Sequence, residues 1–123
     1  MPKPETLQLL QKAKEDEDTI DAVLPRKLWN IDSYHAQQAA EKFIKAAIVE
    51  SNGIPLRSHD LVDLIKVHPK YIANQKIVDA ADRLTPMASD SRYPGFSNFT
   101  QSEAEQAVVD LNLRKAWALS QIL

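Results

Sequence analysis

Apolar residues recur along this chain at three- and four-residue spacing, the periodicity of helices that bury one face. The clearest such stretch contains Ala36, Ala39, Ala40, Phe43, Ala47 and Ile48. Asp32 or Ser33 is the expected N-cap ahead of it, because short polar side chains accept hydrogen bonds from the first-turn N–H groups. Asn52-Gly53 followed by Pro55 is a stop signal. The pattern therefore predicts one long helix between these two boundaries.

Prolines bound three further helical segments, since proline ends or kinks a helix. The first segment begins near Pro4 and ends at Pro25. Its acidic run, Glu15–Asp18, is either a solvated bulge of a single helix or the joint between two short ones, and a single helix is the favoured interpretation. A third helix is expected over 58–69 and a fourth roughly over 75–84.

The last helix has two overlapping capping boxes, Thr100 with Glu103 and Ser102 with Glu105. Only two glycines occur against seven prolines, and the segments between them are rich in good helix formers. The sequence therefore predicts an all-α fold, an up-and-down bundle of about five helices, with residues 1–123 forming a single domain.

Charge and cysteine content exclude several classes of function. Fifteen Lys and Arg against seventeen Asp and Glu give a net charge of −2, which argues against a strongly basic nucleic-acid binder. The absence of cysteine excludes disulfides, thiolate nucleophiles and cysteine-based zinc sites. No apolar run is long enough for a signal peptide or a membrane span, so a cytoplasmic location without membrane association is expected.

Three histidines are the neutral-pH acid and base candidates. No two of them lie four residues apart, and no H-E-x-x-H motif occurs, so no metal site and no cofactor are predicted.

A polar strip accompanies the alanine-rich face of the second helix. It consists of Gln38, Glu41, Lys42 and Lys45, and Glu41 precedes Lys45 in the favourable order for an ion pair. The strip is either a solvated face beside a packed stripe or a polar network at a helix pair or subunit interface. Both interpretations stay open at this stage.

A second constellation is Arg57-Ser58-His59-Asp60, at the expected start of the third helix. One interpretation is a capped helix start, with Asp60 in the first turn complementing the helix dipole. The other is an anion site, because free N–H groups and Arg57 converge there.

These two constellations, in this order, resemble the HEPN family of small helical domains. The resemblance lies in the string His35–Lys42 with Lys45, in the break at Gly53, and in His59-Asp60-Leu61. The Tyr93-Pro94 turn before an Ala-rich last helix is also similar.

The resemblance implies an up-and-down helical bundle, commonly a homodimer, that acts with a minimal nucleotidyltransferase partner in toxin–antitoxin-like systems. Some members are metal-independent ribonucleases with an arginine followed after four to six residues by a histidine, and no arginine of this chain has a histidine at that distance. The leading hypothesis is therefore a non-catalytic module that binds a nucleotide or a protein partner. Its polar groove would contain His35, Gln38, Glu41, Lys42, Lys45, Arg57, His59 and Asp60.

Two alternatives remain beside this hypothesis. One is a ribonuclease with an atypical site built on Arg57, His59 and perhaps His35, although RNA is not the favoured ligand. The other is a purely structural or protein-interaction bundle, in which Glu41, Lys42 and His59 hold the helices together.

Overall fold

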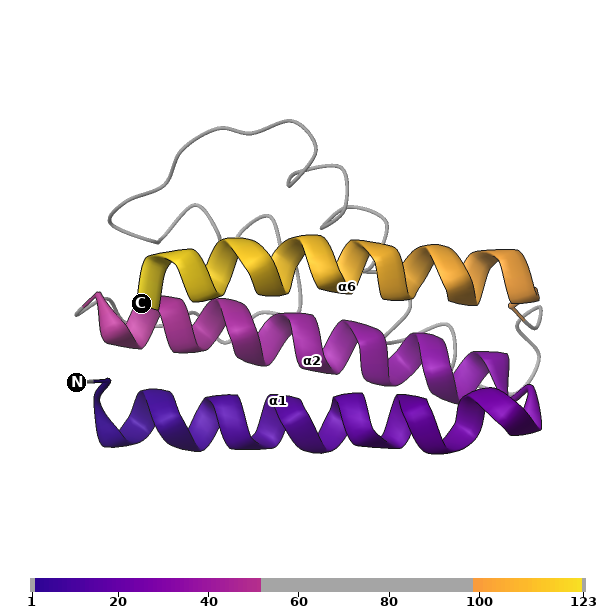
Figure 1. Ribbon diagram of the computed structural model, residues 1–123, viewed down its shortest axis with the longest axis horizontal. Helices are drawn as coiled ribbons and strands as arrows, with labels where there is room; N and C mark the ends of the chain where they lie inside the picture. The colour runs from indigo at the N-terminus through magenta and orange to yellow at the C-terminus, as the bar shows by residue number, and fades with distance from the viewer. Residues whose placement is uncertain (1, 52–98, 123) are drawn as a thin grey trace.

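The computed structural model describes residues 2–51 and 99–122, which form three long α-helices and one short 3₁₀ turn. Helix α1 spans Pro4–Val23, α2 spans Trp29–Glu50 and α6 spans Gln101–Ile122. Helix α2 lies between the other two, antiparallel to α1 and running in the same direction as α6 (Figure 1). The all-α fold predicted from the sequence is confirmed.

The first helix is continuous through its acidic run, as the favoured interpretation predicted. Pro4 occupies its first turn, where the missing N–H costs nothing. Its N-cap, Lys3, provides no side-chain cap; instead Glu50 at the end of α2 accepts hydrogen bonds from the Lys3 N–H (2.8 Å) and the Thr6 hydroxyl (2.9 Å). The Lys3 N–H and the Thr6 hydroxyl lower the pKa of Glu50. One carboxylate thus ties the start of α1 to the end of α2.

The connection between α1 and α2 is a single 3₁₀ turn, Leu24–Arg26, which contains Pro25. It ends at Lys27, whose φ of 57° and ψ of 36° lie in the left-handed region. This conformation lets the Lys27 N–H reach the Leu24 carbonyl at 3.0 Å and turns the chain into α2. A lysine there is strained, because its Cβ crowds the following carbonyl group.

We expect Lys27→Gly to raise the free energy of unfolding by about 0.5 kcal/mol, since glycine relieves this strain but loses more entropy on folding. The neighbouring Arg26→Gly is the matched control, because Arg26 lies in the 3₁₀ turn; it should lower stability by about 0.5–1 kcal/mol. Urea denaturation measures both, and equal losses in the two variants would contradict a strained Lys27.

The start of α2 differs from its predicted position. The helix begins at Trp29, with Leu28 as an N-cap that makes no side-chain hydrogen bond. Asp32 and Ser33 lie inside the helix and are fully buried, so neither is the N-cap that the sequence predicted. The end of α2 at Glu50 agrees with the predicted stop at Asn52-Gly53, two residues that lie outside the described part.

The core is built on the alanine-rich face of α2, as the periodicity predicted. Ala36, Ala39, Ala40 and Ala47 have no exposed surface and pack in one cluster with residues of α1 and α6. Small side chains let neighbouring helices approach closely, and Phe43, Ile44 and Ile48 fill the wider space between them. Helix α2 is therefore the central element on which the other two described helices dock.

Helix α6 begins with the first of the two predicted capping boxes. The Thr100 hydroxyl accepts from the Glu103 N–H, and Glu103 Oε1 accepts from the Thr100 N–H, both at 3.1 Å. The second predicted box is wrong, because Ser102 is already the second residue of the helix.

The predicted third and fourth helices and the Tyr93-Pro94 turn lie outside the described residues. Within residues 2–51 and 99–122, no helix is both long and apolar enough to cross a membrane.

Candidate functional site

Asp16 of α1 organises the predicted polar strip of α2. Its Oδ1 lies 2.7 Å from Nδ1 of His35, and its Oδ2 accepts a hydrogen bond of 2.5 Å from the ammonium of Lys42. The two nitrogen groups are seven residues apart on α2 and so lie on one side of the helix. Asp16 is 7% exposed, so the sequence interpretation of a solvated acidic bulge is wrong for this residue.

The next turn of α2 carries a second ion pair. Glu41 is buried and accepts a hydrogen bond from the Lys45 ammonium at 2.7 Å, which confirms the predicted pairing. The Gln38 amide donates to Gln37 Oε1 at 2.8 Å. The side chains of Lys42 and Lys45 are 29% and 24% exposed. The strip is thus mostly buried, and its lysine side chains are more exposed than the carboxylates that they contact.

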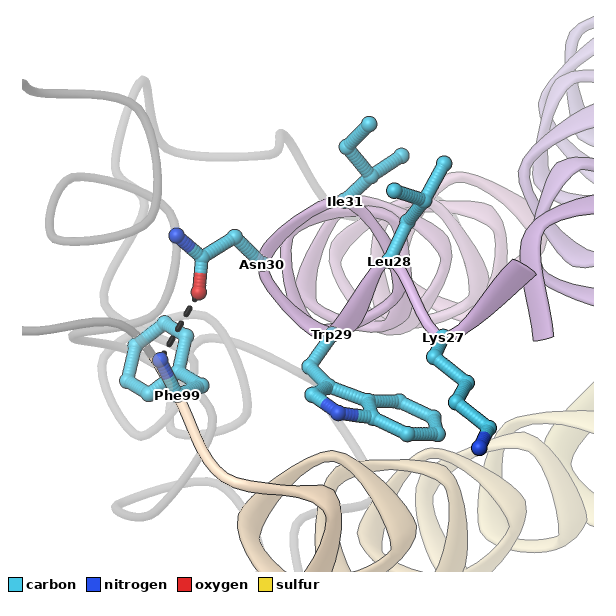
Figure 2. A pocket seen from close by; sticks show the side chains of 6 residues that line it. All are labelled: Lys27, Leu28, Trp29, Asn30, Ile31 and Phe99. Atoms are coloured by element: carbon cyan, nitrogen blue, oxygen red, sulfur yellow. Dashed lines mark hydrogen bonds between the residues drawn. The ribbon is translucent and has the colours of Figure 1, made fainter.

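A pocket of about 290 Å³ lies at the end of the α1–α2 connection, where α2 begins. Its lining is shown in Figure 2: Lys27, Leu28, Trp29, Asn30, Ile31 and Phe99. Asn30 Oδ1 accepts a hydrogen bond of 2.8 Å from the N–H of Phe99, two residues before α6, and this bond fixes the chain there against the first turn of α2. The sequence interpretation missed this pocket, because its walls come from residues about seventy positions apart.

Comparison with known proteins places this arrangement in a family. The model of the HEPN domain matches residues 6–112, which is most of the chain. The chain belongs to the HEPN family. The resemblance inferred from His35–Lys42 and His59-Asp60-Leu61 is therefore confirmed.

Two solved structures share the HEPN fold of this chain. The crystal structure of TT1696 from Thermus thermophilus has a TM-score of 0.88 at 21% identity and covers 97% of this chain and 99% of its own. The structure of ST0689, an archaeal HEPN homologue, has a TM-score of 0.78 at 20% identity and covers 96% of this chain and 98% of its own. No curated protein matches the chain. At these identities the similarity shows the fold alone.

Three of the eight residues predicted for the HEPN polar groove lie outside the described part: Arg57, His59 and Asp60. The other five share α2, and His35, Lys42 and Lys45 each meet a carboxylate. Among the described residues, no three His, Asp or Glu side chains are placed to hold a metal ion.

Two charged side chains of this HEPN domain are buried without a hydrogen-bond partner in the described part of the chain. Asp32 is fully buried in the first turn of α2, and desolvation raises its pKa from 3.8 to about 6. Arg114 of α6 is also fully buried; burial lowers its pKa to about 9, and its guanidinium lies 4.9 Å from the centre of the Trp117 ring. Burial of a charge is costly, which makes both residues sensitive points of the fold.

Proposed function

We propose that this HEPN domain is a non-catalytic module that binds a nucleotide through the Lys42–Lys45 side of α2. The observation that supports the proposal is the anchoring of these two lysines, one helical turn apart, by Asp16 and Glu41. An ammonium group carries three N–H donors, and its carboxylate contact uses one of them. The remaining N–H donors of the two anchored lysines form a surface on which a phosphate group can accept hydrogen bonds.

The buried carboxylates decide how strongly this surface attracts a phosphate. Asp16 and Glu41 balance the charges of Lys42 and Lys45, so the attraction comes from oriented donors more than from net charge.

Thermal-shift measurements with ATP, ADP, AMP, GTP and a short RNA, with and without magnesium, test the proposal. The double variant Lys42→Gln/Lys45→Gln should weaken the binding of the best nucleotide by at least about 100-fold, since each charge-assisted hydrogen bond contributes about 1.5–3 kcal/mol. Affinity is measured by calorimetry at a temperature where the variant is folded.

The matched control is Lys12→Gln/Lys14→Gln on α1, which removes two lysines that also meet carboxylates but are about two-thirds exposed. It should leave nucleotide affinity unchanged. Equal nucleotide affinity in the two double variants would show that Lys42 and Lys45 do not form the binding site. If no nucleotide changes the melting temperature of the unaltered protein, the proposal of nucleotide binding is wrong.

The contact between Asp16 and His35 favours one second candidate, metal-independent RNA cleavage. A carboxylate 2.7 Å from one imidazole nitrogen orients the ring and leaves the other nitrogen to act as a general base. This candidate predicts RNA degradation without added metal that disappears in His35→Gln. RNA that stays intact during long incubation with the unaltered protein excludes it.

We make four further proposals, which rest on the resemblance to HEPN proteins. These are a homodimer, a minimal nucleotidyltransferase partner, a role in a toxin–antitoxin-like system, and a cytoplasmic location. Co-expression with the protein encoded next to this chain, followed by size-exclusion chromatography, tests the first two.

A further inference from the structure

The pocket at the start of α2 has a mainly apolar lining that reaches the surface. Leu28 and Ile31 are 38% and 42% exposed, and the rings of Trp29 and Phe99 contribute the aromatic part of the wall. Figure 2 shows Leu28 and Ile31 on one side of the helix start and Trp29 and Phe99 on the other. Exposed aliphatic side chains beside partly buried aromatic rings form the kind of surface that receives an apolar side chain of another molecule.

The walls of this pocket are fixed in place. The Asn30 amide oxygen holds the Phe99 backbone at 2.8 Å, and Trp29 to Ile31 belong to the first turn of a 22-residue helix. A pocket whose walls are already ordered loses little entropy when it is filled.

Two neighbouring cations, Lys27 in the lining and Arg26 before it in the 3₁₀ turn, distinguish this pocket from the rest of the described surface. Arg26 and Lys27 are exposed, and neither has an ion pair or a side-chain hydrogen bond within residues 2–51 and 99–122. By contrast, Lys12, Lys14 and Lys115 each meet a carboxylate. This part of the surface is therefore complementary to negative charge.

We propose that this pocket docks a segment of a protein partner that presents an apolar or aromatic anchor residue next to Asp or Glu. The anchor enters the pocket lined by Ile31, Trp29 and Phe99, and the acidic residues face Lys27 and the preceding Arg26. This site lies beyond the nucleotide strip and does not depend on it. A nucleobase fits the lining less well, because the amide oxygen of Asn30 is already used by Phe99. Apart from that oxygen, the neutral polar side-chain groups of the lining are the Asn30 amide nitrogen and the Trp29 indole N–H. These are too few to recognise the edge of a base.

Selection from a random dodecapeptide library displayed on phage tests the proposal, with the whole chain as the target. The expected winners combine a large apolar residue with neighbouring Asp or Glu. Winning peptides are then synthesised, and their affinity is measured by fluorescence. In a Trp117→Phe background Trp29 is the remaining tryptophan, so filling of the pocket changes its emission directly.

Exposed positions supply variants with matched controls. Ile31→Ser and Lys27→Gln should each weaken peptide binding at least tenfold. Val109→Ser and Lys12→Gln, which alter similarly exposed residues elsewhere, should not change it. The proposal is overturned if no peptide is enriched, if the winners lack acidic residues, or if Ile31→Ser and Val109→Ser have the same effect. Displacement of the peptide by AMP would also overturn it and would assign the pocket to a nucleotide instead.

Discussion

Asp16→Ala is expected to lower the free energy of unfolding by about 3 kcal/mol, because it removes the carboxylate that contacts both His35 and Lys42. The loss has two parts. The contact that joins α1 to α2 disappears, and two side chains that are about three-quarters buried, His35 and Lys42, lose their shared acceptor. For a domain of this size, about 3 kcal/mol corresponds to a melting temperature lower by roughly 10 °C.

Asp18→Ala is the matched control for this result. It makes the same chemical change two residues further along α1, in a pair with Lys14 whose side chains are 62% and 66% exposed. Exposed pairs contribute about 0–1 kcal/mol, so this variant should remain near the stability of the unaltered chain. Equal losses at the two positions, measured by urea denaturation, would show that Asp16 is an ordinary surface acid and that the strip does not hold α1 against α2.

The contrast between these two aspartates shows what the sequence can predict. The starts of α1 and α6 follow from local signals: Pro4 at one and the Thr100–Glu103 box at the other. Nothing local separates Asp16 from Asp18, because the partners of Asp16 lie 19 and 26 residues away on another helix. The sequence therefore predicted the helix correctly but placed Asp16, which contacts two residues of α2, in a solvated segment.

The start of α2 was mispredicted for a related reason. A capping residue was expected, and Asp32 and Ser33 are the chemically suitable ones. The helix instead begins earlier, at Trp29, and the Leu28 carbonyl accepts a backbone hydrogen bond from the Asp32 N–H at 3.0 Å. In this first turn Asn30 contacts Phe99, and both residues line the pocket. The misplaced helix boundary and the missed pocket thus lie together, where residues distant in the sequence meet.

Asp32→Asn is expected to stabilise the protein by about 2 kcal/mol at pH 7 and to have almost no effect at pH 4. Burial raises the pKa of Asp32 from 3.8 to about 6. Between these values the folded state keeps a proton that the unfolded state has released, so folding stability falls as the pH rises through this window and reaches its full penalty above it. A shift of this size corresponds to about 3 kcal/mol, and the favourable interaction of a first-turn carboxylate with the helix dipole offsets part of it.

The difference between the variant and the unaltered chain isolates Asp32, because the other titrating groups are common to both proteins. Asp21→Asn, the same substitution at an exposed position of α1, is the control and should not give this gain in stability. Parallel stability curves for Asp32→Asn and the unaltered chain would mean that the carboxylate is solvated or paired in solution. A gain in the free energy of unfolding that grows as the pH rises from 4 to 6 would instead establish that the first turn of α2 contains a buried, uncompensated carboxylate. The neutral asparagine side chain has nearly the same shape and avoids the free energy of burying that charge.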